Sequence, residues 1–159
     1  MTATVDYYSQ CEDGLQALFR TLTDYIKHSW QVSDDDTNLK NGADYFVFFT
    51  PGMFQEIPNG DDQKNALFTW EVLFEIRVRF KSFKESKPVF KAFRSELFNI
   101  VKKHNRLDYP KPAVGRGVLK TTLSATSKMV YWADKPNQTA PSWIVQQMKA
   151  NILQVVPVG

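Results

Sequence analysis

The sequence predicts a single α+β domain in which two helices pack on one face of a mainly antiparallel, four-stranded sheet. Two segments place apolar residues at helical spacing, and four others have the alternation or the β-branched and aromatic content of strands. Their order is helix, strand, strand, helix, strand, strand, which suits helices packed on one side of an antiparallel sheet. The chain of 159 residues has the length of one ordinary domain, so we assign residues 1–159 to it.

The first helix is expected from Asp6 to Trp30. Its apolar residues share one stripe at helical spacing, and no proline interrupts the segment. Asp13 suits the positive N-terminal end of the helix dipole, whereas Lys27 and His28 suit the C-terminal end. Residues 31–43 are polar and predict a loop.

A short strand and a long loop are expected next. Tyr45–Phe49 predicts a buried strand that stops at the Pro-Gly pair beginning residues 51–66. Those residues predict a long loop, and long loops in compact domains are usually functional or mobile. Met53, Phe54 and Ile57 are apolar residues of this loop, so we expect it to protrude and contact a neighbouring protein. The alternative is that Met53 and Phe54 fold back over the sheet edge.

The clearest strand signal covers residues 68–82. Apolar residues occupy every even position from Phe68 to Phe80, while the odd positions are mostly charged, with Leu73 as the apolar exception. This period predicts one face on the core and one face in water. At roughly 3.3 Å per residue the strand would span about 50 Å, so we expect a projecting end or a bulge.

The second half of the chain predicts a helix and two strands. Ser86 is expected to cap a helix over 89–106, with a proline tolerated in its first turn. An irregular connector at 107–117 leads to a strand at 118–133, and the last strand is expected at 143–156.

Charge is distributed unevenly along the chain. Residues 1–62 hold eleven acids and three bases, a net charge of −8, and residues 63–159 hold seventeen bases and six acids, a net charge of +11. Such a division suits nucleic-acid binding or head-to-tail docking of identical chains, or each charge simply solvates its own face. For docking, the acidic first third would meet a basic surface around Arg77, Arg79, Lys91 and Arg94.

No motif predicts an enzyme, and we expect no cofactor and no metal site. The chain lacks the glycine-rich phosphate loops. His28 and His104 have no carboxylate partner that the sequence identifies, and Cys11 has no basic neighbour to lower its pKa. The stretch that begins at Asp34 imitates a calcium loop, but Leu39 and Tyr45 replace its essential Gly and Glu.

The composition also bears on location. The single cysteine excludes an internal disulfide, which favours a reducing cytoplasm. We expect no membrane association, since no stretch of about 18 apolar residues exists, and the N-terminus lacks a secretory signal pattern.

The order of the elements and the residue pattern of the strands resemble those of a known family. An amphipathic helix precedes a strand that ends in Thr50-Pro51-Gly52, and the alternating strand Phe68–Phe80 is followed closely by the helix at 89–106. Over about residues 6–156 this resembles the tail terminator (tail completion) proteins of long-tailed, non-contractile bacteriophages. The resemblance rests on element order, length and strand texture, because the family has no invariant catalytic motif.

The resemblance implies a structural virion protein located at the head–tail junction and assembled in the host cytoplasm. Such proteins form a homo-oligomeric ring, typically of six subunits, that caps the tail tube protein and stops its polymerisation. The ring also offers a surface to the head-completion or neck protein. DNA passes through its channel without specific binding, and Asp34, Asp35 and Asp36 are candidates for lining that channel because like charge prevents adhesion.

Three other functions stay open from the sequence. The first is another head–tail connector or neck protein, and the second is a small enzyme with an unrecognised site. The third is a basic nucleic-acid-binding domain, because the bases of the second helix and its connector could contact phosphates. Against it, the exposed helix face has few aromatic residues and no recognition motif is present.

Overall fold

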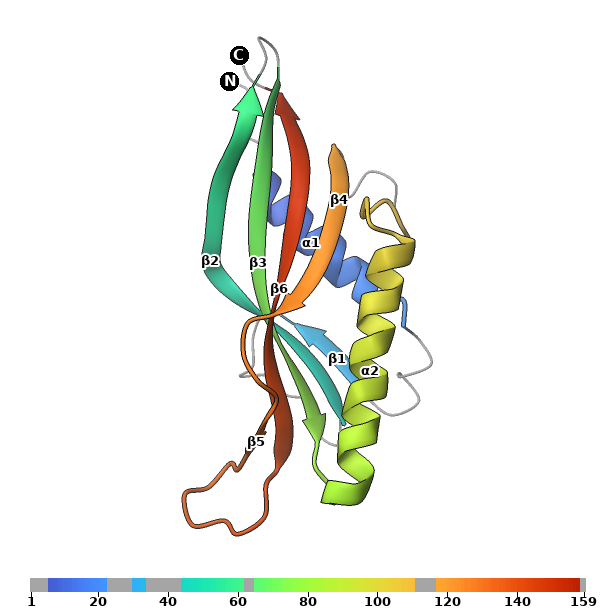
Figure 1. The fold of residues 1–159 in the computed structure, drawn as a ribbon, viewed down its shortest axis with the longest axis vertical. Helices are drawn as coiled ribbons and strands as arrows, with labels where there is room; N and C mark the ends of the chain where they lie inside the picture. Colours follow the sequence, from blue (N-terminus) through green and yellow to red (C-terminus); the bar gives the residue numbers. More distant parts are fainter. Residues whose placement is uncertain (1–5, 23–29, 34–43, 62–64, 111–116, 158–159) are drawn as a thin grey trace.

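The computed structural model describes residues 6–22, 30–33, 44–61, 65–110 and 117–157 (Figure 1). The described chain contains two helices and six strands, and the longer of these elements follow the long axis of the molecule. In chain order they are α1 (Tyr7–Phe19), β1 (Trp30–Ser33), β2 (Tyr45–Asp61), β3 (Asn65–Arg79), α2 (Phe83–Lys103), β4 (Val118–Ala125), β5 (Val130–Trp132) and β6 (Trp143–Pro157).

The strands form one sheet in the order β1-β2-β3-β6-β4, and β5 pairs with the beginning of β6. Every strand pair is antiparallel except β1 with β2, which is parallel. The predicted α+β class with a mainly antiparallel sheet is therefore confirmed. The sheet has six strands rather than four, because β1 is added and the segment predicted at 118–133 divides into β4 and β5.

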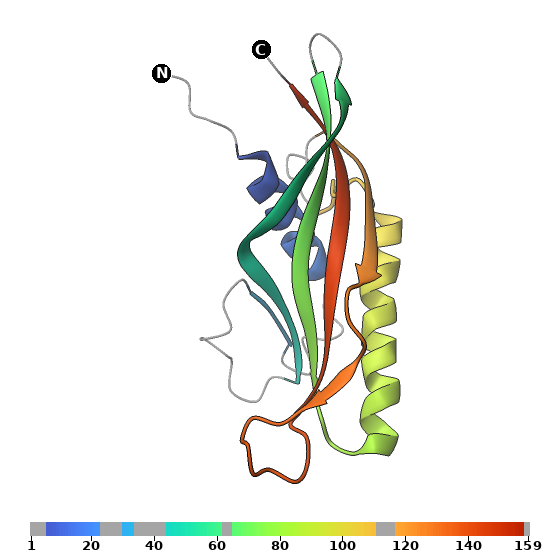
Figure 2. The same ribbon diagram turned by 60° about the vertical axis from the view of Figure 1, so that its left-hand side comes forward.

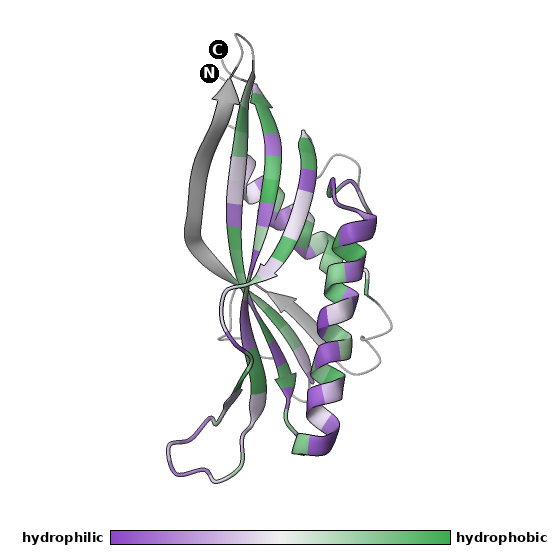
Figure 3. Ribbon diagram, in the orientation of Figure 1, coloured by the Kyte–Doolittle hydropathy of each residue, from purple (hydrophilic) through white to green (hydrophobic). Residues whose placement is uncertain are grey.

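Both helices pack on the same face of this sheet (Figures 1 and 2). The even-numbered residues of β3 form the centre of the core, as the alternation predicted, and Phe74 and Ile76 are completely buried. On α2 the buried stripe is Phe90, Phe93, Leu97 and Val101. Figure 3 shows hydrophobic and hydrophilic residues alternating along β3 and β6, as expected for a sheet with one face on the core.

The first helix is shorter than predicted. It ends at Phe19, where the backbone N–H groups of Thr21 and Leu22 bond to Leu18 and Phe19 and tighten the chain into a turn. Trp30 belongs to β1 rather than to the helix, and β1 begins the segment predicted as a loop at 31–43. The helical prediction for 23–29 and the loop prediction for 34–43 lie outside the described residues.

The loop predicted at 51–66 is wrong, because β2 continues through Pro51 and Gly52 to Asp61. Phe49 pairs with Phe74 and Phe54 with Val72, so β2 has three more residues than β3 at this point and bulges. Pro58 is tolerated because this part of β2 lies at the sheet edge. β3 pairs with β6 over its whole length, so the bend lies in β2 and no end of β3 projects unpaired.

The second helix begins earlier than predicted. Its N-cap is Ser82, whose side chain accepts a hydrogen bond from the backbone N–H of Glu85 at 3.1 Å. Ser86 lies in the first turns and instead accepts hydrogen bonds from the backbone N–H groups of Lys81, at 2.7 Å, and of Ser82. Pro88 is thus inside α2 rather than at its first position.

Candidate assembly interface

The second face of the sheet has a mixed aromatic and charged surface. Cross-strand partners share a face, so the register places the odd-numbered residues of β3 and β6 together with Phe46 and Phe48 of β2. No described helix packs against these side chains. We call this surface the open face. Its most buried residues are Phe46, Phe48, Trp143 and Val145, which form a cluster separate from the main core.

Two arginines of β3 stack on aromatic rings of the open face. The guanidinium carbon of Arg77 lies 4.9 Å from the ring centroid of Phe48 and 4.9 Å from that of Trp132, so Arg77 is held between the two rings. The guanidinium of Arg79 lies 4.4 Å from the ring of Trp143. Each such contact contributes about 0.5–2 kcal/mol, depending on how far it is desolvated.

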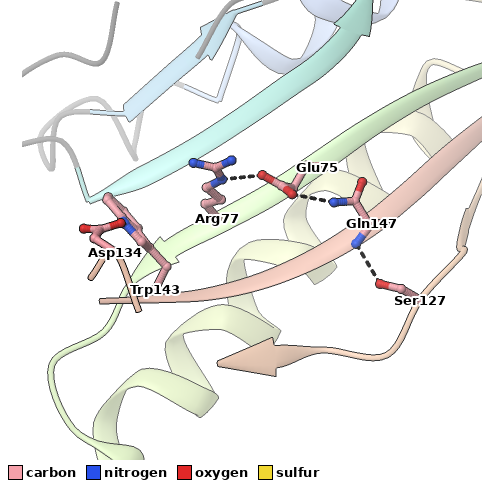
Figure 4. A network of polar contacts seen from close by, with 6 residues as sticks. All are labelled: Glu75, Arg77, Ser127, Asp134, Trp143 and Gln147. Atoms are coloured by element: carbon pink, nitrogen blue, oxygen red, sulfur yellow. Dashed lines mark hydrogen bonds and ion pairs between the residues drawn. The ribbon is translucent and has the colours of Figure 1, made fainter. Parts of the chain in front are cut away.

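A chain of polar contacts extends from Arg77 across the sheet (Figure 4). Glu75 accepts hydrogen bonds from Arg77 and from the side chain of Gln147. The backbone N–H of Gln147 donates to Ser127 at 3.0 Å, which joins β6 to the β4–β5 connection. The indole of Trp143 donates to Asp134 at 3.1 Å. These contacts fix the side chains of the open face in one arrangement.

Both lateral edges of the sheet are open within the described residues. On one side, β1 pairs only with β2, and β2 from Phe54 to Asp61 pairs only with β3. On the other side, β4 and β5 pair only with β6. We call these sides the β1/β2 edge and the β4/β5 edge. Unpaired backbone groups on edge strands are a template for another strand.

The two edges differ in charge. Asp44 directly precedes β2, and β2 itself contains the acidic residues Glu56 and Asp61 and no base. On the other side α2 carries six bases and two acids. Lys87, Lys91 and Arg94 share one flank of α2, because residues separated by three, four or seven positions are neighbours on a helix. This flank faces the β4–β5 connection, since Arg94 donates to Gln146 at 2.8 Å and Gln146 donates to the carbonyl of Ser127 at 3.0 Å.

The described side chains offer little reactive chemistry. Cys11 is completely buried and donates to Gln154 at 3.4 Å, and burial raises the pKa of the Cys11 thiol to about 12, so the nucleophilic thiolate is not formed near neutral pH. Burial also raises the pKa of Tyr45, with Asp44 adding to the effect. His104 stacks on Tyr109 at 4.3 Å between ring centroids. Among the described residues no group of three His, Cys, Asp or Glu could hold a metal ion.

Neither α1 nor α2, the two helices in the described part of the chain, is long and apolar enough to cross a membrane.

The predicted interface residues lie in three places. Arg77 and Arg79 lie on the open face, whereas Lys91 and Arg94 lie on α2, on the opposite side of the sheet. The four bases therefore do not form one continuous surface. Phe54 and Ile57 lie on the part of β2 that forms the β1/β2 edge, and Met53 lies in the bulge directly before it. The predicted channel-lining residues Asp34, Asp35 and Asp36 lie outside the described residues.

The open-face aromatic cluster was not identified from the sequence. The sequence does contain a pattern that indicates it. Residues 45–49 are all apolar or aromatic, so this strand places such side chains on both faces of the sheet, including Phe46 and Phe48 on the second face. Neither Trp143 of this cluster nor Trp132 beside it could be assigned to the open face from the sequence. Their place opposite Arg77 and Arg79 depends on the register between β5, β6 and β3.

Comparisons with known proteins find a shared fold but assign the chain to no family. No protein-family model matches the chain, and no curated protein matches it in sequence. The fold is shared with a chain from a solved structure described as the virion of a native gene transfer agent particle. The two chains are 12% identical, with a TM-score of 0.51 over 93% of this chain and 98% of the other.

Proposed function

We propose that this chain is a structural virion protein that forms a ring by head-to-tail association. In this role the ring caps the tail tube, stops its polymerisation and joins the tail to the head or neck. Its partners are further copies of itself, the tail tube protein and a head-completion or neck protein, and DNA passes through without specific binding.

The observation that carries the proposal is the fold shared with a gene transfer agent virion chain. The likeness extends over nearly the whole of both chains, so it concerns the complete domain rather than a common substructure. Because a fold can host several functions, the tail-terminator role depends in addition on the element order and strand texture described above.

The sheet edges support head-to-tail association. A ring of identical chains needs two different, complementary surfaces on each chain. The β1/β2 edge is acidic and the β4/β5 edge is next to the basic flank of α2, so neighbouring copies would attract each other. β2 and β4 run in opposite directions, because three antiparallel pairings separate them. Copies placed side by side in the same orientation would therefore bring β2 and β4 together as antiparallel neighbours.

Electron microscopy tests the proposal. The purified chain should form rings, alone or when mixed with tail tubes. Lysates of cells in which the gene is disrupted within the genome that carries it should contain tubes of uncontrolled length. Tails of normal length in the absence of the chain would contradict the capping role.

Nucleic-acid binding is a second candidate, supported by the basic flank of α2. Lys87 and Lys91 are exposed and in reach of a phosphate backbone. A gel-shift titration with a 30-base-pair duplex at about 0.15 M salt separates the two functions. The ring proposal expects no shift at this ionic strength, whereas a monomer that shifts the duplex would favour nucleic-acid binding.

A further inference from the structure

We propose that neighbouring copies of this chain are joined by an aromatic knob on one flank of α2 that inserts into a pocket on the other flank. The proposal rests on the ring function above and names the contact that closes it. The knob consists of Phe80, Phe83 and Tyr131. The lining of the pocket includes Asp44, Tyr45, Val78, Glu85, Pro88 and Val89.

The knob is a preformed aromatic surface. Phe83, the first residue of α2, is 63% exposed, and Tyr131 of β5 is 39% exposed. The rings of Phe80, Phe83 and Tyr131 contact one another edge to face, with centroids 4.9, 5.0 and 5.8 Å apart. They hold each other in place while leaving apolar area in water, an arrangement typical of interface anchors.

The pocket lies between the beginning of β2, the end of β3 and the first turns of α2. Its volume is about 490 Å³, within the range of roughly 300–1,000 Å³ found for ligand sites. It is therefore large enough for aromatic side chains. Tyr45, Val78 and Pro88 provide apolar walls, and Val89 is 38% exposed. Asp44 on its border is held by Arg79 at 3.3 Å, so that side of the pocket is fixed.

Knob and pocket lie on opposite flanks of the same helix turns, which is why a second copy is the occupant we infer. Phe83 contacts Tyr131 on the β4/β5 side, whereas Glu85 and Val89 line the pocket beside Tyr45 on the β1/β2 side. One chain cannot bring these two flanks together. Two chains side by side can, and each then keeps a free knob and a free pocket for the next copy.

The charges beside the two surfaces also match. Lys84, which follows Phe83, is exposed, and so is Glu85 on the border of the pocket. Asp44 is already paired with Arg79 at 3.3 Å and with Lys81 at 4.0 Å, so Glu85 is the carboxylate that can meet a cation of a second copy. When the knob of one copy enters the pocket of the next, Lys84 approaches Glu85. The contact thus combines apolar anchors at its centre with opposite charges at its rim, as in well-characterised protein interfaces.

Sedimentation of the full chain with one variant on each side tests the contact. Phe83→Ser removes the knob and Val89→Glu places a charge in the pocket. Each variant alone should associate at least about 30-fold more weakly than the unmodified chain. An equal mixture should form a pair of chains but no ring, because only the intact knob of one variant and the intact pocket of the other can combine. Tyr109→Ser is the matched control, since Tyr109 is 45% exposed but lies beyond the far end of α2, and it should leave association unchanged.

A cross-linking experiment in the presence of tail tubes covers the case in which rings form only on them. Phe83→Cys in one chain and Val89→Cys in another should form a disulfide-linked pair on oxidation, whereas Tyr109→Cys with Val89→Cys should not. Circular dichroism and thermal unfolding must match the unmodified chain for each variant. Rings formed by Phe83→Ser would overturn the contact and leave the ring function intact. Absence of the Phe83–Val89 cross-link at concentrations where the unmodified chain associates would also overturn it, while normal tails without the chain would contradict the proposed function itself.

Discussion

At the residue scale, Phe74 is the centre of the main core. It is completely buried, and its ring lies 5.5 Å from the rings of both Phe19 and Phe49. Phe74→Ala should lower the free energy of unfolding by about 3–5 kcal/mol, because it removes the ring and leaves a cavity. Chemical denaturation measures the loss. Leu73→Ala, on the half-exposed open face, is the control and should cost about 1 kcal/mol. Equal losses for the two variants would contradict the assignment of the faces.

Cys11 predicts a loss of stability at alkaline pH. The pKa of its thiol is raised by burial from an ordinary value of 9.0 to about 12. Above pH 9 the unfolded chain releases this proton while the folded chain retains it, so the free energy of unfolding falls as pH rises from 9 towards 12. Below pH 9 the thiol is protonated in both states, and the stability is at its full value. The free energy of unfolding, measured by chemical denaturation between pH 8 and about 11, should fall more steeply with pH for the unmodified chain than for Cys11→Ala. Parallel curves would contradict the prediction.

At the element scale, the start of α2 depends on Ser82. Its side chain caps the helix by accepting from the N–H of Glu85. Ser82→Ala should cost about 1 kcal/mol of stability, and Ser82→Gly only a few tenths. Thermal or chemical unfolding distinguishes them. A loss for Ser82→Ala no larger than that for Ser82→Gly would show that the cap contributes nothing.

The outer part of β2 carries the predicted docking residues Met53, Phe54 and Ile57. Because this part of β2 lies at a sheet edge, we keep the prediction that it contacts a neighbouring protein. Met53→Ser combined with Phe54→Ser should leave a folded chain of near-normal stability that no longer caps tails. Tail lengths in lysates, measured by electron microscopy, test this. An unfolded double variant, or tails of normal length, would assign both residues to covering the sheet edge.

At the scale of the whole molecule, the division of charge predicts salt-sensitive rings. Lys87 and Lys91 are exposed, and exposed charges are screened over about 8 Å at physiological ionic strength. Rings should therefore dissociate progressively as salt is raised, and Lys87→Glu with Lys91→Glu should weaken them at low salt. Sedimentation measures both effects. Arg77 is a poorer choice for charge reversal, because its side chain is only 13% exposed and is held between two rings. Rings that stay intact as salt is raised would mean that apolar contacts, rather than charges, hold the subunits together.

The sequence by itself determined the fold class, the buried face of β3 and the buried stripe of α2. These follow from local periodicity, since a period of two or of 3.6 residues identifies a face without knowledge of what covers it. The sequence also identified the charge asymmetry that supports head-to-tail association. It missed the extension of β2, because a Pro-Gly pair usually ends a strand, and here the bulge and the edge position accommodate it.

Only the tertiary structure decided which distant residues meet. The register of β3 with β6 brings Trp143 opposite Arg79, and the pairing of β5 with β6 brings Trp132 beside Arg77. The sheet also separates Arg77 and Arg79 from Lys91 and Arg94, which the sequence had grouped by charge alone. The knob and the pocket likewise depend on how β5 and β2 lie on either side of α2. Such juxtapositions depend on the pairing of strands far apart in the chain, and local periodicity carries no information about that pairing.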